Sequence, residues 1–279
     1  MAPLTNSNST SRLQGGKRLR ETRPDIPLVS IITVVFRDSK ELLPLLHNVV
    51  ERKGPEAEFI IVDGGSTDGT VDLLRKFDDQ IDYWISEPDA GIYDAMNKGI
   101  SLASGQFILH INAGDRLEHI PVPELKQCLA AGTDIACFSV NLVGWGNFPP
   151  RPGFRLFLDN SISHQGTFYR RTSHPGYDLS FPFLADFDCN QKMILKSRMK
   201  TAFFNEVVAE RLSIGVSKTR AADREIYRVV KKNMGQFYAL VAVVWRALAP
   251  TRTWIKGILY RMDKASKTKT KPQSVGSRR

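Results

Sequence analysis

The chain has 279 residues, of which 42% are hydrophobic and 24% charged, so it is long enough for one large core or two smaller ones. Its net charge of +10 is uneven, because residues 211–279 carry 17 Lys/Arg and 3 Asp/Glu while the central segment 25–210 is acidic. An acidic folded segment argues against a nucleic-acid-binding domain, so no nucleic-acid partner is expected.

Both ends of the chain differ from the middle in composition. Residues 1–24 lack the apolar core of a signal peptide, and their Ser, Asn and Gly content predicts disorder. Three cysteines, Cys128, Cys137 and Cys189, share no metal-ligand spacing, which favours reduced thiols in a cytoplasmic protein. No run reaches the ~18 apolar residues of a bilayer-spanning helix.

Strands and helices alternate in the first half of the chain. The predicted elements are a strand at Leu28–Phe36, a helix at Glu41–Glu51, a strand at Phe59–Val62, a helix at Val71–Phe77, a strand at Ile81–Ile85, a helix at Ile92–Ala103 and a strand at Phe107–Ile111. This alternation predicts an α/β fold with a mainly parallel sheet flanked by helices.

The second half has a weaker pattern. Strands are predicted at Asp134–Val140, Gly166–Tyr169 and Thr201–Val208, a helix at Ala185–Lys196, and loops over 141–163.

Acidic residues follow two of the predicted buried strands. Asp63 ends one strand in a glycine-rich turn, and Asp115 follows another in Asn112-Ala113-Gly114-Asp115. Either residue alone is more often a turn former than a ligand. Parallel sheets bind ligands at the carboxyl ends of their strands, so the two acids together predict a site at that edge.

Four segments occur in the order VSIITVVFRD, FIIVDGGSTDGT, SEPDAGIYDAMNKGI and ASGQFILHINAGD, followed by SISHQGTFYRR and FLADFD. The set resembles glycosyltransferase family 2, whose fold is called GT-A, closely over residues 28–118 and less closely to about residue 215. Through its GIYDAMNKG segment, the chain most resembles the bacterial branch of the family that builds surface polysaccharides. The resemblance implies an inverting sugar transfer from a nucleoside diphosphate sugar to a glycan or lipid-linked acceptor, with Mg²⁺ or Mn²⁺ as cofactor.

The resemblance also implies roles for individual residues. Thr33, Phe36, Asp63, Asn97 and Lys98 would lie at the nucleotide-sugar donor, Asp115 would bind the metal, His164 and Gln165 would lie near the acceptor, and Asp186 would be the general base. An inverting displacement needs a base to take the proton of the acceptor hydroxyl.

Two positions depart from the family pattern. Many relatives have a second acid where Gly64 stands, and its absence leaves the nucleotide base open. Ala185 replaces a common Glu, so Asp188 stays an alternative to Asp186 as the base. Either acid can instead stabilise the start of the 185–196 helix, and His164 can be a structural histidine.

The C-terminal segment 216–279 is predicted to be a basic, amphipathic helical extension of a catalytic domain at 25–215. One apolar stripe runs through Ile226, Val229, Val230, Phe237, Leu240, Val241, Val244 and Leu248, and a second through Trp254, Ile255, Ile258, Leu259 and Met262. Basic amphipathic helices lie on anionic membranes, which predicts a peripheral protein at the inner face of the cell membrane. The first stripe can equally pack on the catalytic domain, whereas residues 252–279 favour the membrane.

Two other functions fit parts of the sequence. A nucleotidyltransferase that makes nucleotide sugars shares the α/β sheet, but it usually has a glycine-rich basic loop where this chain has Val35-Phe36-Arg37-Asp38. A non-catalytic membrane adaptor would explain the tail, but it gives no reason for acids at the strand ends.

Overall fold

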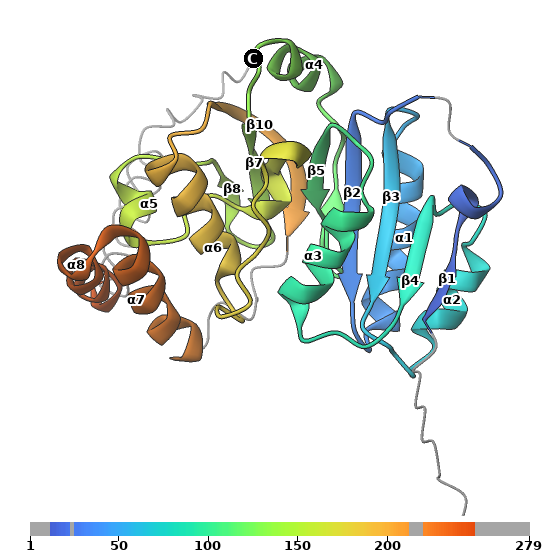
Figure 1. Cartoon of the computed structure of the whole chain (residues 1–279), viewed down its shortest axis with the longest axis horizontal. Helices are drawn as coiled ribbons and strands as arrows, with labels where there is room; N and C mark the ends of the chain where they lie inside the picture. Colours follow the sequence, from blue (N-terminus) through green and yellow to red (C-terminus); the bar gives the residue numbers. More distant parts are fainter. Residues whose placement is uncertain (1–11, 23–24, 212–219, 249–279) are drawn as a thin grey trace, which may run out of the picture.

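The computed structural model describes residues 12–22, 25–211 and 220–248, which form one mixed sheet with helices on both faces (Figure 1). The first half contains β2 (Val29–Val35), α1 (Ser39–Arg52), β3 (Ala57–Asp63), α2 (Thr70–Lys76), β4 (Tyr83–Ser86), α3 (Ile92–Leu102) and β5 (Phe107–His110). Strands β4, β3, β2 and β5 pair in parallel, which confirms the predicted α/β architecture. Their boundaries lie within two residues of the predicted ones.

The second half adds further elements. They are β6 (Arg116–Leu117), α4 (Val122–Ala130), β7 (Ile135–Leu142), β8 (Gly146–Phe148), α5 (Phe154–Leu158), β9 (Thr167–Arg170), α6 (Ala185–Asn190) and β10 (Thr201–Arg211), with 3₁₀ turns η2 (His164–Gly166) and η3 (Arg171–Ser173). A further 3₁₀ turn, η1 (Lys17–Leu19), lies near the start of the chain. The helix predicted at Ala185–Lys196 has the observed bounds, but its second part, η4 (Gln191–Lys196), is a π-helix rather than an α-helix. The sequence analysis missed α4, and it predicted only loop where β8 and α5 form.

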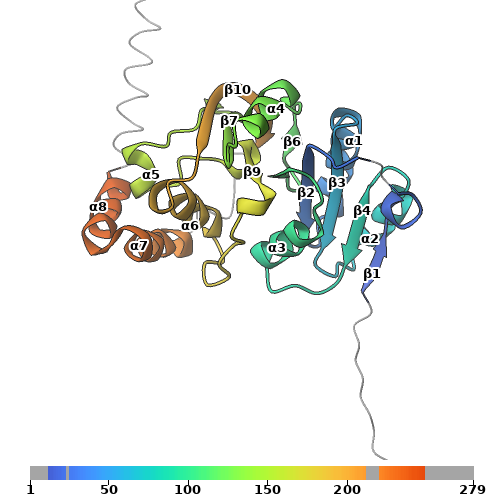
Figure 2. The same ribbon diagram turned by 45° about the horizontal axis from the view of Figure 1, so that its top comes forward.

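The order of the strands explains how distant segments meet. The sheet runs β1 (Leu13–Gly15)-β4-β3-β2-β5-β9-β7-β10-β6, with β8 beside β7. Because β9 is antiparallel to β5, the start of β9 lies near the carboxyl end of β5. The turn η2 directly precedes β9 and contacts β5, β7 and β10. This topology carries His164 and Gln165 to the carboxyl end of β5, where the parallel strands end. Figure 2 shows β9 between β7 and β2.

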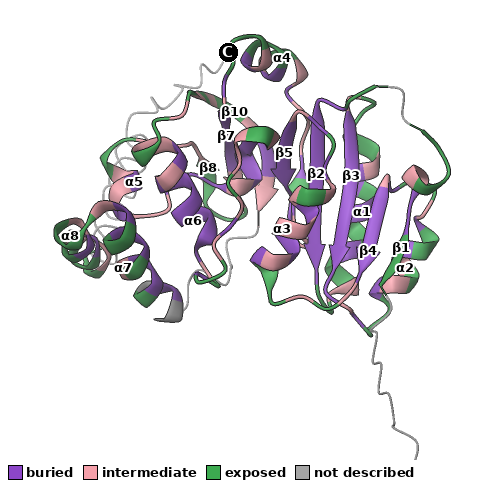
Figure 3. Cartoon of the chain, in the orientation of Figure 1, coloured by how far each residue is buried: buried purple, intermediate pink, exposed green. Residues whose placement is uncertain are grey.

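Two hydrophobic cores cover the two faces of the sheet. Helices α1, α2 and α4 pack on one face through Leu42, Leu46, Leu74 and Leu125. Helices α3, α5 and α6 pack on the other face through Met96, Leu156 and Phe187. Every residue of β2 and β3 is buried, as Figure 3 shows for the central strands, and this accounts for their continuous apolar runs.

The predicted disorder of residues 1–24 is wrong for the part that the structure describes. Leu13–Gly15 pairs with β4, and the Arg18 guanidinium forms an ion pair with the buried Glu58 carboxylate. The prediction failed because it rested on polar composition, whereas the unpaired edge of β4 supplies hydrogen-bond partners to an added strand. Residues 1–11 and 23–24 lie outside the described residues.

Two helices, α7 (Arg220–Met234) and α8 (Gln236–Ala247), follow the sheet at one end of the molecule. They do not form one continuous apolar stripe, because Gly235, with φ of 95°, turns the chain between them. Ile226, Val229 and Val230 of α7 are buried in the second core described above, so this half packs on the sheet domain. None of the helices in the described ranges combines the length and apolarity needed to cross a membrane. The predicted domain boundary at 215/216 and the tail 252–279 lie outside the described residues.

Candidate active site

The carboxyl ends of β2, β3 and β4 line up at one edge of the sheet. Asp63, the last residue of β3, is in register with Val35 of β2 and Ser86 of β4. His110, the last residue of β5, pairs with Ile32 of β2, and the Asn112–Asp115 turn follows it. The loops that follow these strands therefore share one edge, as the positions of the two acids predicted.

Asp63 is held by hydroxyl groups and is fully buried. Its Oδ2 accepts hydrogen bonds from the Ser66 backbone N–H at 2.9 Å and from the Ser86 hydroxyl at 2.5 Å. Its Oδ1 accepts a hydrogen bond from the Ser66 hydroxyl. The carboxylate thus shapes the turn after β3, and its predicted contact with the nucleotide stays a prediction.

Phe36 stands at the open edge beside this turn, with 56% of its surface exposed. The guanidinium of Arg37 lies 5.0 Å from the centre of its ring. A Cβ on Gly64 would lie 3.1 Å from the Phe36 ring and 2.6 Å from Oδ2 of Asp89. The Asp89 carboxylate therefore occupies the space that a side chain at position 64 would need.

Asp89 was not singled out by the sequence analysis, although it lies in the SEPDAG part of a quoted motif. Its Oδ1 accepts a hydrogen bond from the backbone N–H of Gly91 at 2.8 Å. Lys98 holds the same loop, because its Nζ donates to the Pro88 carbonyl at 2.8 Å and lies 3.0 Å from the Glu87 carboxylate. The loop after β4 thus brings a carboxylate close to Gly64, the position where many relatives have an acid and this chain has none.

Two of the predicted donor residues make structural contacts instead. Thr33 is fully buried, and its hydroxyl donates to the Ile111 carbonyl. The Asn97 amide joins the backbone of Tyr177 through two hydrogen bonds, of 2.9 and 2.7 Å. Neither side chain is brought to the open edge with Phe36, and their donor-binding roles stay predictions.

Asp115 is nearly buried in the turn after β5. Its Oδ2 accepts hydrogen bonds from the side-chain amide of Gln165 at 3.0 Å and from the backbone N–H of Asn112 at 3.2 Å. Among the described residues, none donates a hydrogen bond to its Oδ1. Burial raises the pKa of Asp115, and the nearby charges of His164 and Arg211 only partly offset this. The carboxylate is therefore poorly stabilised by the protein alone and would gain from a cation.

Asp186, in the first turn of α6, lies at the centre of a polar cluster. Its Oδ1 accepts hydrogen bonds from the Tyr93 hydroxyl and the Phe187 backbone N–H, both at 2.9 Å. Its Oδ2 accepts one from the Asn160 amide at 2.8 Å and lies 3.2 Å from Nδ1 of His164. Burial acts to raise the pKa of Asp186, but these partners outweigh it and hold the pKa below its usual value.

The adjacent pair His164 and Gln165 joins the two predicted catalytic centres. His164 contacts Asp186, and Gln165 contacts Asp115, so one turn links acids that are far apart in the sequence. The Nε2 of His164 is buried and has no hydrogen-bond partner among the described residues. His164 thus lies beside Asp186 with one ring nitrogen unpartnered, and its acceptor-side role stays a prediction.

Asp188 points to a different part of the molecule. Its carboxylate lies 2.6 Å from Nζ of Lys192 and accepts a hydrogen bond from the Asn233 amide of α7 at 2.9 Å. The side chain is 1% exposed. Asp188 therefore ties α6 to α7, whereas Asp186 faces the Asp115 turn through His164 and Gln165.

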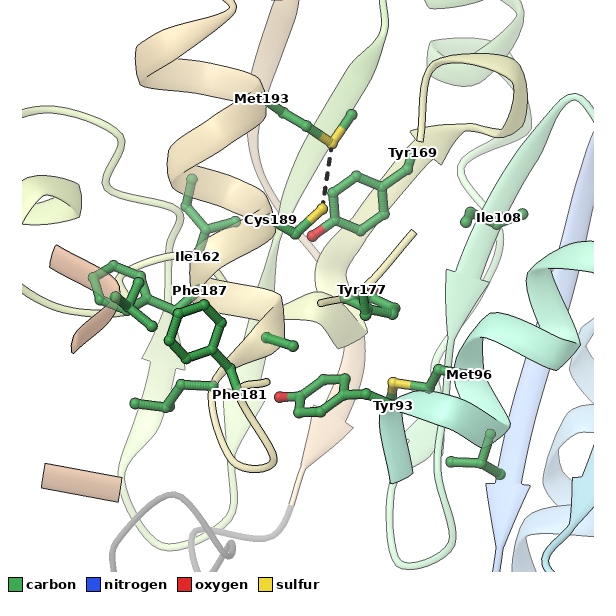
Figure 4. Packing of buried hydrophobic residues seen from close by; sticks show 14 of the residues in the cluster. Tyr93, Met96, Ile108, Ile162, Tyr169, Tyr177, Phe181, Phe187, Cys189 and Met193 are labelled. Atoms are coloured by element: carbon green, nitrogen blue, oxygen red, sulfur yellow. Dashed lines mark hydrogen bonds between the residues drawn. The ribbon is translucent and has the colours of Figure 1, made fainter. Parts of the chain in front are cut away.

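Figure 4 shows buried aromatic side chains of the second core, among them Tyr177 and Tyr93, whose hydroxyl donates to Asp186. The Tyr177 ring lies 5.2 Å from that of Tyr93 and 5.5 Å from that of His110. Both nitrogens of His110 and the hydroxyl of Tyr177 are buried without a partner among the described residues. Burial lowers the pKa of His110 well below its usual value and that of His174 to about 4. These histidines are therefore neutral at pH 7.

Positive charge also reaches the site from β10. Arg211, the last residue of this strand, donates to the Ser163 hydroxyl at 3.3 Å and acts electrostatically on Asp115. The sequence analysis missed it because β10 was read only to residue 208. Among the described residues, no group of three or more His, Cys, Asp or Glu side chains is placed to hold a metal ion. A cation at Asp115 would thus need ligands from the substrate, as Mg²⁺ commonly has in phosphate-binding sites.

The sequence was compared with known families and proteins. The family model described as glycosyl transferase family 2 matches residues 30–196. A PGL/p-HBAD biosynthesis glycosyltransferase of Mycobacterium bovis is 30% identical over 235 residues, which cover 79% of this chain and 90% of that protein. TuaG of Bacillus subtilis, named for teichuronic acid biosynthesis, is 34% identical over 93 residues, covering 32% of this chain and 37% of TuaG.

Solved structures are similar in fold. TarS of S. aureus in complex with UDP matches 81% of this chain and 73% of its own with a TM-score of 0.58 and 14% identity. The mannosyltransferase PcManGT of Pyrobaculum calidifontis, in complex with GDP-Man and Mn²⁺, matches 88% of this chain and 84% of its own with a TM-score of 0.55 and 15% identity. At such identities the likeness concerns the fold alone.

Proposed function

The chain belongs to glycosyl transferase family 2, and we propose that it transfers a sugar, with inversion, from a nucleoside diphosphate sugar to a surface-glycan or lipid-linked acceptor. The observation that carries this proposal is the His164–Gln165 turn, which links the predicted base Asp186 to the predicted metal ligand Asp115. The relatives named for PGL/p-HBAD and teichuronic acid biosynthesis support the acceptor class.

The donor nucleotide binds at the edge formed by the loops after β2, β3 and β4. The exposed Phe36 ring offers an apolar face to a nucleobase. Asp89, beside Gly64, offers a carboxylate to the donors of the base or ribose. Asp63 and Lys98 hold the two loops in place. UDP, UDP-GlcNAc and GDP-Man occur in the solved structures of similar fold, which supports a nucleotide sugar at this edge.

Asp115 holds a divalent cation, Mg²⁺ or Mn²⁺, that offsets charge on the leaving diphosphate when bound. Two observations support a cation at Asp115. No described residue donates a hydrogen bond to its Oδ1, and burial disfavours the unpaired charge of the carboxylate. Arg211 adds a permanent positive charge near the same carboxylate. The Mn²⁺ in the PcManGT complex supports the assignment.

Asp186 is the general base of the transfer. Its lowered pKa keeps the carboxylate ionised at neutral pH, ready to accept a proton. Of the four contacts that Asp186 makes with described residues, the one with His164 is the longest, at 3.2 Å. The carboxylate is therefore held least tightly on the His164 side, and the acceptor hydroxyl binds there. Asp188 is the weaker candidate for this role, because its carboxylate contacts Lys192 and Asn233 and has no contact with the His164–Gln165 turn.

The acceptor places the enzyme at the cytoplasmic face of the membrane, and residues 252–279 contribute to this location. These residues contain nine Lys/Arg and one Asp, with Trp254 and Tyr260 among their apolar residues. Such a segment binds anionic lipids by charge and by apolar anchors. Deleting 252–279 should release the protein from anionic vesicles and leave turnover on a soluble acceptor analogue intact. Equal co-sedimentation of both forms would contradict this role.

A screen of nucleotides tests the donor proposal directly. A ligand that binds only the folded state raises the apparent Tm as its concentration exceeds Kd. We expect a nucleoside diphosphate to raise the Tm more with Mn²⁺ than without it, and the Phe36→Ala variant to lose most of this shift. Release of nucleoside diphosphate from a nucleotide sugar must then depend on an acceptor, which neither a nucleotidyltransferase nor a non-catalytic adaptor would show.

A further inference from the structure

Helix α8 presents an apolar row to solvent. The residues Phe237, Leu240, Val243, Val244 and Leu248 are between 48% and 72% exposed. Their spacing of three or four residues places them on one side of the helix. The opposite side, with Ala239 and Ala242, is buried against the domain. A surface helix in a soluble domain usually carries polar residues on its outer side, whereas this one is apolar there.

The apolar surface extends beyond α8 itself. Phe154 of α5 is 60% exposed, and its ring lies 6.4 Å from that of Trp245. Large exposed apolar patches mark sites of contact with proteins or membranes. Figure 3 shows the exposed side of α8 at the end of the molecule farthest from β1.

Helix α7, which packs against α8, presents a basic side. Arg224, Arg228, Lys231 and Lys232 are exposed, at the i, i+4, i+7 and i+8 positions of one helix side. Lys232 pairs with Asp178, and Arg228 packs over the Phe181 ring. No ion pair joins Arg224 or Lys231 to a carboxylate of the described residues. At least two positive charges are therefore free for an anionic partner.

We propose that the α7–α8 hairpin docks on an anionic phospholipid bilayer, with the outer side of α8 in the acyl region and the basic side of α7 at the headgroups. The charge of α7 matches an anionic surface, and the adjacent apolar row matches the boundary beneath it. The inference deepens the membrane location in the proposed function and is independent of the catalytic assignments.

The geometry requires α8 to lie along the membrane rather than across it. Its twelve residues span about 18 Å, which is short of the ~30 Å hydrocarbon core. Leu248, the last described residue of the segment, leads directly into the basic residues 249–279. The basic composition of the residues that follow the hairpin therefore favours the same partner.

Two exposed leucines at the other end of the molecule provide a matched control. We propose Leu240→Gln/Leu248→Gln as the test variant and Leu19→Gln/Leu43→Gln as the control, with all four leucines between 37% and 53% exposed. The probe is a vesicle of phosphatidylglycerol and phosphatidylcholine in equal parts, and the protein is the full chain. The test variant should lose about tenfold or more in vesicle partitioning, because apolar side-chain burial drives insertion. The control should partition like the wild type.

A second pair of variants separates charge from apolar contact. Arg224→Gln/Lys231→Gln should weaken binding to the anionic vesicles, should not alter binding to pure phosphatidylcholine, and should show less salt dependence than the wild type. Val243→Ser/Val244→Ser, on the same side of α8, replaces the leucine variant if that protein does not fold. Nucleoside diphosphate release with a soluble acceptor should be unchanged in all variants, so a failure here is distinct from a failure of the catalytic proposal.

Equal partitioning of the α8 variants and the control would overturn the proposal. Light scattering supplies the other decisive outcome. If the leucine variant converts a dimer to a monomer while vesicle binding is unchanged, the apolar row belongs to a contact with a second copy of the chain, and the membrane assignment is wrong.

Discussion

The donor side and the acid side of the candidate site are built in different ways. On the donor side, two of the three hydrogen bonds that described residues donate to the Asp63 carboxylate come from Ser66, three residues away, and the third comes from Ser86. On the acid side, Asp115 is held by Gln165, 50 residues away, and Asp186 by Tyr93, 93 residues away. The contacts of Asp63 are therefore mostly local, whereas each acid-side carboxylate has a partner from a distant part of the domain.

This difference has a consequence for substitutions. A locally held carboxylate shapes its own loop, so its loss should alter donor affinity and local structure. A carboxylate that is buried and held across the domain costs free energy, and an apolar residue would pack there more favourably. Such a carboxylate is therefore retained for chemistry or specificity. Variants on the acid side should therefore lower turnover more than they lower stability. Variants on the donor side should have smaller effects on turnover and on stability.

Asp115→Ala should have the largest effect. We expect transfer to fall below detection with the fold intact, because the variant removes the carboxylate proposed to hold the cation. Turnover across a Mn²⁺ titration and circular dichroism would measure the two effects. Wild-type activity that survives EDTA would rule out the metal assignment.

Asp186→Asn should lower kcat by about 10²–10⁴-fold, the usual contribution of a general base, with donor binding nearly unchanged. Asp188→Asn is the matched comparison, since it makes the same change two residues away. It should keep kcat within a few-fold and instead lower the free energy of unfolding by about 1–3 kcal/mol, as expected when a buried hydrogen-bonded charge loses its partners. The reverse pattern would move the base to Asp188.

The acid side should also make stability pH-dependent. The pKa of His174 is about 4 in the folded state, against about 6.5 in unfolded chains. Above pH 6.5 the residue is neutral in both states and has no effect. Between pH 6.5 and 4 the unfolded state binds the extra proton, so the free energy of unfolding should fall by about 3 kcal/mol.

Urea unfolding at several pH values would measure that slope. His174→Gln should flatten it whatever the variant's baseline stability, because the slope counts protons rather than contacts. An equal slope in wild type and His174→Gln would show that His174 does not titrate in this range.

Gly64→Ala should have the smallest effect. The new Cβ would lie 2.6 Å from Oδ2 of Asp89, so the loop after β4 must shift. We expect the donor KM to rise by a few-fold to tenfold with little change in kcat, about 1 kcal/mol in binding. Gly153→Ala is the control, because its Cβ would have no neighbour within 4 Å. An unchanged KM in Gly64→Ala would remove Asp89 from the proposed donor pocket.

The locally determined part of the molecule is also the part that the sequence predicted accurately. The β2–β5 half was predicted to within two residues, because its buried parallel strands have long apolar runs and its turns have local signals. The elements missed or mistaken were short or irregular, such as α4, α5 and the π-helical turn of Gln191–Lys196. Their formation depends on packing against distant residues, for which a window of sequence has no signal.

The sequence by itself determined the α/β class, the strand edge where Asp63 and Asp115 lie, and the family, because these depend on local hydrophobic period and ordered motifs. Only the tertiary structure decided which acid of the Asp186/Asp188 pair faces the site, since two residues on one helical turn point in different directions. It also placed Asp89 beside Gly64 and divided the C-terminal stripe at Gly235 into a buried part and an exposed one. Each of these outcomes depends on how elements pack against one another, and that information is spread over residues far apart in the chain.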